Sequence, residues 1–168
     1  MQKSLCKLLL TFLCCVCAVM LGFGQKKFTP SSYIEEYRSV AQQLMQETGV
    51  PASVILAVAI HESAYGNSRI ARHLNNHFGI KGKNNSKAIR SAYKGYESTL
   101  ASYRDFVGLL RRKRTTQPLF NEKSATDYKA WTLAIARSGY SVTKDWRHKV
   151  LSTIDRYNLD EYDKEAVN

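Results

Sequence analysis

Cysteine is absent from most of this chain. The sequence has 168 residues, and its four cysteines, Cys6, Cys14, Cys15 and Cys17, all lie near the N-terminus. The remainder therefore has no disulfide framework, no thiol nucleophile and no cysteine metal site. It is still long enough to bury a sizeable core without such cross-links.

Charge is scarce at the N-terminus. Lys3 and Lys7 are the only charged residues before position 25, and Leu8–Phe23 is almost entirely apolar. The run is short for a membrane span with flanks, and it ends at small residues, as a secretory signal peptide does. We predict a signal peptide over residues 1–24 and one domain over residues 25–168. Retention as an uncleaved anchor is the alternative. The predicted location is the periplasm or the cell surface.

Acidic residues are in the minority. Residues 25–168 carry 23 basic and 14 acidic side chains, a net charge of +9. An exported basic protein favours an anionic partner, such as a cell-wall polymer, an anionic membrane surface or a nucleic acid. The one basic cluster, Arg111–Arg114, ends a predicted helix, where cations suit the helix dipole. Two interpretations of this cluster stay open, a solvated helix end and a wall-binding patch. The sequence does not indicate the oligomeric state.

Low-complexity linkers and internal repeats are also absent, which favours a single domain. Apolar residues recur at helical spacing and predict a mainly α fold. The expected helices cover residues 31–48, 52–62, 98–112, 125–137 and 145–157. Ser31 or Ser32 is the expected N-cap of the first. Residues 66–96 are irregular, with a weak strand or hairpin signal in 88–96. The polar tail from Asp160 is expected to fray.

Glu62 stands out at the end of the second expected helix, which is apolar on nearly every face. Partial burial and the negative end of the helix dipole both disfavour the ionised form of this carboxyl. A carboxylic acid that stays protonated near neutral pH can donate to a leaving oxygen, as glycoside cleavage requires. A salt-bridged surface carboxylate is the alternative. His61-Glu62 is half of a zinc motif, but position 65 is Tyr65 in place of the second His. No metal site and no cofactor are predicted.

Four segments resemble the bacterial peptidoglycan N-acetylglucosaminidases of glycoside hydrolase family 73. The sequence HESAYGNS begins at His61, and NNHFGIKG begins at Asn75. Downstream, YKGYES begins at Tyr93 and YSVTKDWRHK begins at Tyr140. The four segments occur in the family's order and at suitable spacing. Together the resemblance spans nearly all of residues 34–162.

The resemblance implies a lysozyme-like, mainly helical α+β fold with a small, short β-lobe beside a cleft for peptidoglycan glycan strands. It implies hydrolysis of the β-1,4 bond between N-acetylglucosamine and N-acetylmuramic acid, with no nucleic-acid partner. Glu62 matches the catalytic acid, and Tyr140 lies near the reaction centre. The residues that match substrate-binding or cleft-shaping positions are Asn76, Phe78, Gly79, Tyr65 and Tyr96. Ordinary core packing is the alternative for Tyr140 and Phe78.

The sequence departs from the family pattern in one respect. Many members place a second acid in the β-lobe, but residues 81–96 contain no Asp or Glu. Glu97 is the next candidate, and Asp105 is expected to pair with a base. Three routes stay open. The substrate's own 2-acetamido group can act as nucleophile, a single Glu can perform lytic transglycosylase chemistry, or the chain can be a binding module without activity.

Overall fold

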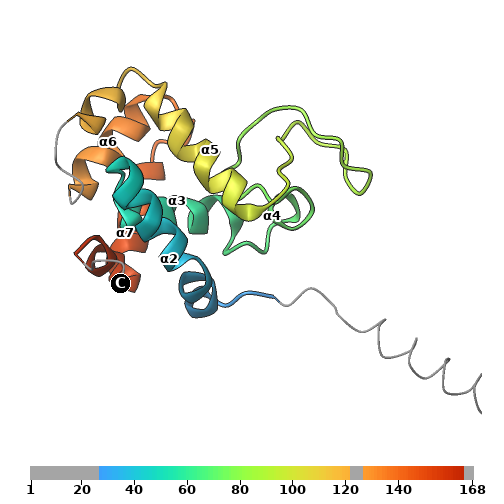
Figure 1. The fold of residues 1–168 in the computed structure, drawn as a ribbon, viewed down its shortest axis with the longest axis horizontal. Coiled ribbons are helices and arrows are strands. Elements are labelled where there is room, and N and C mark those ends of the chain that lie inside the picture. The colour runs from blue at the N-terminus through green and yellow to red at the C-terminus, as the bar shows by residue number, and fades with distance from the viewer. Residues whose placement is uncertain (1–26, 122–126, 165–168) are drawn as a thin grey trace, which may run out of the picture.

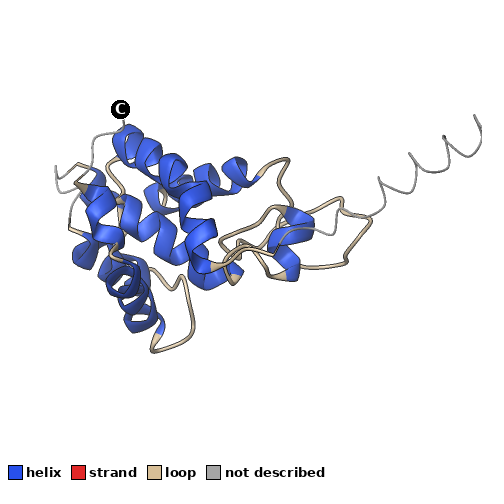
Figure 2. Cartoon of the chain, turned by 90° about the horizontal axis from the view of Figure 1, so that it is seen from below, coloured by secondary structure: helices blue, strands red, loops and turns tan. Residues whose placement is uncertain are grey.

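The computed structural model describes residues 27–121 and 127–164, and most of this part of the chain is helical (Figures 1 and 2). The α-helices are α2 (Pro30–Thr48), α3 (Ala52–Ser63), α4 (Arg69–Leu74), α5 (Thr99–Arg111), α6 (Tyr128–Arg137) and α7 (Trp146–Tyr157). Two 3₁₀ helices complete it, η2 (Gln117–Phe120) and η3 (Leu159–Asp163). The mainly helical prediction is confirmed. The predicted signal peptide and the expected helix start at residue 125 lie outside the described residues.

Helix α3 forms the centre of the core. Every residue from Ala52 to Ile60 is buried, as its uniformly apolar sequence predicts. Helices α2, α6, α7 and η3 pack around it. Burying each large aliphatic side chain of α3 contributes about 1.5–3 kcal/mol. The core therefore fixes the backbone that leads to Glu62. Across residues 27–121 and 127–164, no helix is long and apolar enough to cross a membrane.

Helix α2 begins slightly earlier in the chain than the sequence indicates. Thr29, and neither Ser31 nor Ser32, is its N-cap. The Thr29 hydroxyl accepts the Ser32 N–H at 3.2 Å, and the Ser32 hydroxyl accepts the Thr29 N–H at 2.9 Å. This reciprocal pair is a capping box closed by a serine. Gly49, at φ 80°, ends the helix as expected.

The C-terminal segment does not fray at residue 160, so that prediction was wrong as far as residue 163. Leu159 is fully buried in the core. The Asp163 carboxylate accepts hydrogen bonds from the Ser53 N–H at 2.8 Å and the Ser53 hydroxyl at 2.6 Å. It thereby satisfies one of the free N–H groups at the start of α3. Burial raises the pKa of Asp163 to about 6, although both hydrogen bonds oppose the rise.

Residues 81–95 form an arm of two antiparallel legs that stands out from the helical body between α4 and α5 (Figure 1). One isolated bridge, Lys81 to Tyr93, joins the legs at their base. Backbone hydrogen bonds flank it, from Gly82 N–H to Ala92 O and from Lys94 N–H to Ile80 O, each 2.9 Å. The expected β-lobe thus takes the form of a bridged arm, and the short strand expected in 88–96 is reduced to this bridge.

Candidate active site

A strained turn follows α3 directly after Glu62 and Ser63. Ala64, Tyr65 and Gly66 have φ values of 50°, 57° and 73°, so three successive residues are left-handed. This conformation is unfavourable for the two residues that have a Cβ atom. The Ser63 hydroxyl donates to Ala59 O at 2.6 Å and accepts the Gly66 N–H at 2.7 Å, which holds the turn. The reversal leaves Glu62, partly exposed, at the edge of the core.

Asn76 fastens the loop that faces this turn. Its side-chain amide donates to Ile80 O and Lys94 O, each at 2.8 Å. Its Oδ1 accepts the N–H groups of Phe78 at 3.3 Å and Ile80 at 3.2 Å. Asn76 is 1% exposed. One buried side chain therefore ties residues 76–80 into a fixed shape and joins them to the base of the arm.

The two oxygens of the Glu62 carboxyl have different surroundings. The indole N–H of Trp146, at the start of α7, donates to Oε1 at 2.8 Å. Oε2 faces Gly79, where an added Cβ would lie 3.3 Å from it. The same Cβ position is 3.9 Å from the ring of Tyr93. Glu62 is thus held through Oε1, while Oε2 lies close to the backbone of Gly79, which has no side chain to cover it.

Tyr140 closes another side of the same site. Its hydroxyl donates to Phe78 O at 2.6 Å, and its ring packs 5.4 Å from the ring of Trp146. Burial, and then the negative charge of Glu62, raise the pKa of Tyr140 well above its usual range. The hydroxyl stays neutral at physiological pH. The predicted proximity of Tyr140 and Glu62 therefore appears in the geometry.

Tyr96 is held by a charged cluster around Asp105, which also contains Lys94 at the base of the arm. Asp105 Oδ2 accepts the Tyr96 hydroxyl at 2.8 Å and the Lys94 ammonium at 2.7 Å, and Arg112 lies 3.5 Å from Oδ1. Burial raises the pKa of Asp105, but these hydrogen bonds outweigh it and leave the pKa below its usual value. Asp105 pairs with bases, as the sequence indicates. It holds Tyr96 in place instead of facing Glu62.

Two predicted site residues lie apart from this cluster. The Tyr65 hydroxyl is 3.0 Å from that of Tyr157, and Tyr65 lines a pocket of about 390 Å³ between α3 and α7. Glu97 is exposed and lines another pocket, with His73 and Tyr96. The structure therefore does not bring Glu97 to the Glu62 carboxyl as a second acid.

Two further predicted contacts have a supporting role. Asn76 has both ends of its amide engaged by the backbone, and Phe78 is 1% exposed with its ring stacked 4.3 Å from Phe106. Their buried side chains shape the loop, so the assignment of direct substrate contact to them is revised. Gly79 keeps its predicted place beside the acid.

Sequence reasoning missed Trp146 and Tyr93 as site residues. Trp146 has the helical spacing of a core residue, and it is indeed 2% exposed, but its indole N–H is aimed at Glu62. Buried Trp side chains usually find a hydrogen-bond partner, which was the available signal. Tyr93 gave none, because its position depends on how the arm folds back onto Gly79.

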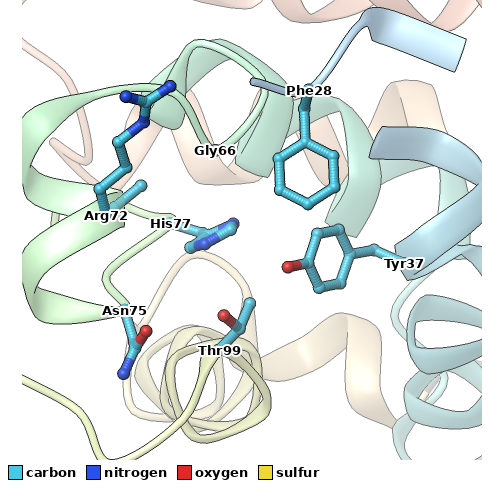
Figure 3. Close-up of a pocket in the computed structure, with 8 residues that line it drawn as sticks. Phe28, Tyr37, Gly66, Arg72, Asn75, His77 and Thr99 are labelled. Atoms are coloured by element: carbon cyan, nitrogen blue, oxygen red, sulfur yellow. The ribbon is translucent and has the colours of Figure 1, made fainter. Parts of the chain in front are cut away.

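A separate pocket of about 120 Å³ lies behind the loop (Figure 3). Phe28 and Tyr37 border it on one side and Arg72 and Asn75 on the other, with His77 between them. His77 Nδ1 lies 2.6 Å from the Tyr33 hydroxyl, and burial lowers the pKa of His77 to about 4. Glu62 does not line this pocket. We therefore interpret the residues around the pocket as packing that supports the loop. In the described ranges, no group of three or more His, Cys, Asp or Glu side chains could hold a metal ion.

Comparison with known proteins agrees with this arrangement. Residues 38–159 match the family model described as mannosyl-glycoprotein endo-beta-N-acetylglucosaminidase. The chain is 31% identical over 152 residues to exo-glucosaminidase LytG of Bacillus subtilis (strain 168), covering 79% of this chain and 53% of that protein. It is 25% identical over 146 residues to peptidoglycan hydrolase FlgJ of Escherichia coli (strain K12), covering 74% and 46%. The chain thus spans about half the length of these relatives.

Solved structures share the fold. The catalytic domain of the autolysin Auto from Listeria monocytogenes superposes with a TM-score of 0.68 at 23% identity, covering 86% of this chain and 93% of that one. The glycoside hydrolase domain of Salmonella typhimurium FlgJ gives 0.61 at 22% identity, covering 78% and 89%. This chain therefore has the same overall fold as these two domains. With the match over residues 38–159, the chain belongs to the mannosyl-glycoprotein endo-beta-N-acetylglucosaminidase family, glycoside hydrolase family 73.

Proposed function

We propose that this protein hydrolyses the β-1,4 glycosidic bond after N-acetylglucosamine in bacterial peptidoglycan, outside the cytoplasm. The observation that carries the proposal is the Glu62 carboxyl, which is held through Oε1 by Trp146 while Oε2 lies beside Gly79, a residue without a side chain. In the proposed reaction, Oε2 is the oxygen that delivers the proton to the glycosidic oxygen. The family match and the naming of its relatives as glucosaminidases and peptidoglycan hydrolases support this substrate.

The second catalytic group is proposed to come from the substrate. The arm has no carboxylate, and the nearest candidates, Glu97 and Asp105, face elsewhere or are ion-paired. Glu62 donates its proton to the leaving oxygen as the 2-acetamido oxygen attacks C1, so the C1–O bond breaks and an oxazolinium ring forms. The Glu62 carboxylate then takes a proton from water, and that water attacks C1 and reopens the ring.

Tyr140 assists this sequence as a neutral hydroxyl. Its proton is donated to Phe78 O, so its oxygen lone pairs are available to a positively charged group. The developing oxazolinium carries such a charge beside Glu62. Tyr140 also fixes the Phe78 carbonyl and with it the position of Gly79, and so it organises the space into which the substrate fits.

The test is digestion of purified sacculi by residues 25–168, with mass spectrometry of the released fragments. Wild type is expected to release muropeptides with reducing N-acetylglucosamine ends. Glu62→Gln, which keeps the shape and the Trp146 contact, is expected to lower kcat by at least about 10³-fold. Glu97→Gln is the matched control and is expected to retain activity.

Three outcomes would contradict parts of the proposal. Anhydro-muramic ends would replace hydrolysis with lytic transglycosylase chemistry at the same acid. Loss of activity in Glu97→Gln to the same degree would make Glu97 the second acid. Binding to sacculi without any release by the wild type would leave a glycan-binding module.

A further inference from the structure

The arm is cationic along its whole length. Lys81, Lys83, Lys87 and Arg90 are all exposed, and no Asp or Glu occurs between residues 81 and 96. Within the described part of the chain, none of these four side chains forms an ion pair. Only Lys94, at the base, has a partner, Asp105. The arm therefore presents a row of positive charges that the protein itself does not neutralise.

The other basic cluster of the chain behaves differently. Arg111 lies over the ring of Phe120 at 5.1 Å, Arg112 pairs with Asp105, and Lys113 donates to Ser138 O at 3.5 Å. Three of the four residues in 111–114 thus have local partners. This favours the helix-end interpretation of that cluster. The four exposed cations of the arm, by contrast, have no ion-pair partner among the described residues.

The arm is also built to hold its shape beside the site. The Asn84 amide donates to Ser91 O at 3.0 Å and to Tyr93 O at 2.8 Å, which links the two legs. Tyr93, at the base of the returning leg, and Glu62 lie on the same side of Gly79, because a Cβ added there would be 3.9 Å from the Tyr93 ring and 3.3 Å from Glu62 Oε2. A glycan strand bound at Glu62 therefore passes the base of the arm, and substituents on that strand come within its reach.

We propose that the arm binds the carboxylates of the peptide stems on the glycan strand, chiefly through Lys83, Lys87 and Arg90. This inference rests on the proposed peptidoglycan substrate and adds a determinant for its peptide portion. Peptide stems recur on alternate sugars and carry free carboxylates. Charges spread along both legs match such a repeating anion, whereas a single phosphate would need a compact pocket. Lys81 forms the bridge at the base of the arm with Tyr93, so it is left unchanged in the test.

The test compares the triple variant Lys83→Gln, Lys87→Gln, Arg90→Gln with a charge-matched control. The control, Arg114→Gln, Lys129→Gln, Arg137→Gln, removes three exposed cations around α6, at the other end of the molecule from the arm (Figure 1). The substrates are sacculi stripped of phosphate polymers, and glycan strands from which an amidase has removed the peptides. Digestion kinetics are measured at low and high salt.

The arm variant is expected to raise KM on peptide-bearing sacculi by about tenfold at low salt, with kcat unchanged and the difference reduced at high salt. On peptide-free strands its KM is expected to stay within about twofold of wild type. The control variant is expected to follow wild type on both substrates. Equal losses on both substrates, or equal losses in both variants, would overturn the proposal. So would an unchanged KM of the arm variant on the stripped sacculi together with a raised KM on sacculi that keep their phosphate polymers.

Binding measured in the Glu62→Gln background separates this inference from the proposed function. If the wild type digests nothing, the proposed activity fails, but sedimentation with sacculi still reports on the arm. Weaker sedimentation of the arm variant, with no change in the control, supports peptide recognition. Unchanged sedimentation rejects it, whatever the activity of the wild type.

Discussion

Helix α3 and the arm are stabilised in opposite ways, although both border the same site. Residues 52–60 of α3 are all buried and pack against four other helical elements. In the arm, only Ile89 is buried, and the legs are joined by one bridge and by the amide of Asn84. Apolar burial thus fixes the wall that carries Glu62. Hydrogen bonds from polar side chains to the backbone fix the wall that carries Gly79 and Tyr93.

The contrast teaches that the two walls can be perturbed separately. Changes in the apolar wall are expected to lower the stability of the whole chain, because α3 contacts most other elements. Changes in the polar wall are expected to displace the arm and its base while the helical body stays folded, because Ile89 is the one buried apolar residue of the arm. Substitutions that pair one residue in each setting can test this directly.

Among substitutions that leave Glu62 in place, the largest effect is expected for Asn76→Ala. This change leaves the N–H groups of Phe78 and Ile80 without their acceptor and releases the base of the arm. We expect about 2–4 kcal/mol of destabilisation. Displacement of Gly79 relative to Glu62 is expected to lower kcat/KM by about 100-fold.

Asn67→Ala is the matched control for that substitution. Asn67 also uses both ends of its amide, bonding Phe28 N–H at 3.0 Å and Phe28 O at 2.8 Å, but it ties down the N-terminal entry to α2. It is expected to cost stability with little change in kcat/KM. Sacculus digestion and urea denaturation measure the two quantities. Similar activity losses in both variants would mean that the loop has no special relation to the acid.

A smaller effect is expected for Trp146→Phe. The ring still fills its place beside Tyr140, but the donor to Glu62 Oε1 is lost. We expect kcat to fall by about tenfold with KM unchanged. The Glu62 carboxyl loses the hydrogen bond that orients it, whereas the substrate-binding contacts stay in place.

Trp131→Phe provides the control for the indole. Trp131 is fully buried, and its indole N–H has no hydrogen-bond partner among the described residues. Its replacement is expected to leave kcat at the wild-type value. If sacculus digestion shows the same fall in kcat for both variants, the effect of Trp146 is due to packing alone and its positioning role is refuted.

The same contrast explains what the sequence could predict. Helices α2, α5, α6 and α7 follow from apolar periodicity, because burial of one face leaves a regular pattern, and α3 follows from its uniformly apolar sequence. Glu62 was visible because a uniformly apolar helix ends in a carboxylate. The arm and its contacts were not visible. Their stability comes from the amides of Asn76 and Asn84, which bond backbone carbonyls 18 and 9 residues further along the chain, respectively. Side-chain-to-backbone hydrogen bonds of that range leave no periodic signal in the sequence.

Short elements and caps were missed for a related reason. Helix α4 has six residues, too few for a periodic pattern, and η3 depends on the pairing of Asp163 with Ser53, 110 residues away. Trp146 has the helical spacing and the burial of a core residue, and neither reveals its contact with Glu62. Its role rests on the direction of one N–H group, which sequence spacing does not encode.

The smallest and most selective effect is expected for Gly79→Ala, compared with Gly49→Ala. Both glycines are left-handed, at φ 62° and 80°, so each alanine should cost about 1 kcal/mol of folding stability. At Gly49 nothing lies within 4 Å of the added Cβ, whereas at Gly79 that Cβ lies 3.3 Å from Glu62 Oε2. The carboxyl must move by a few tenths of an ångström, and Trp146 restrains its other oxygen. We therefore expect similar unfolding midpoints but a roughly fivefold lower kcat for Gly79→Ala alone. Equal kcat values in the two variants would show that Oε2 does not face the substrate space, which would remove the geometric basis for Glu62 as the proton donor.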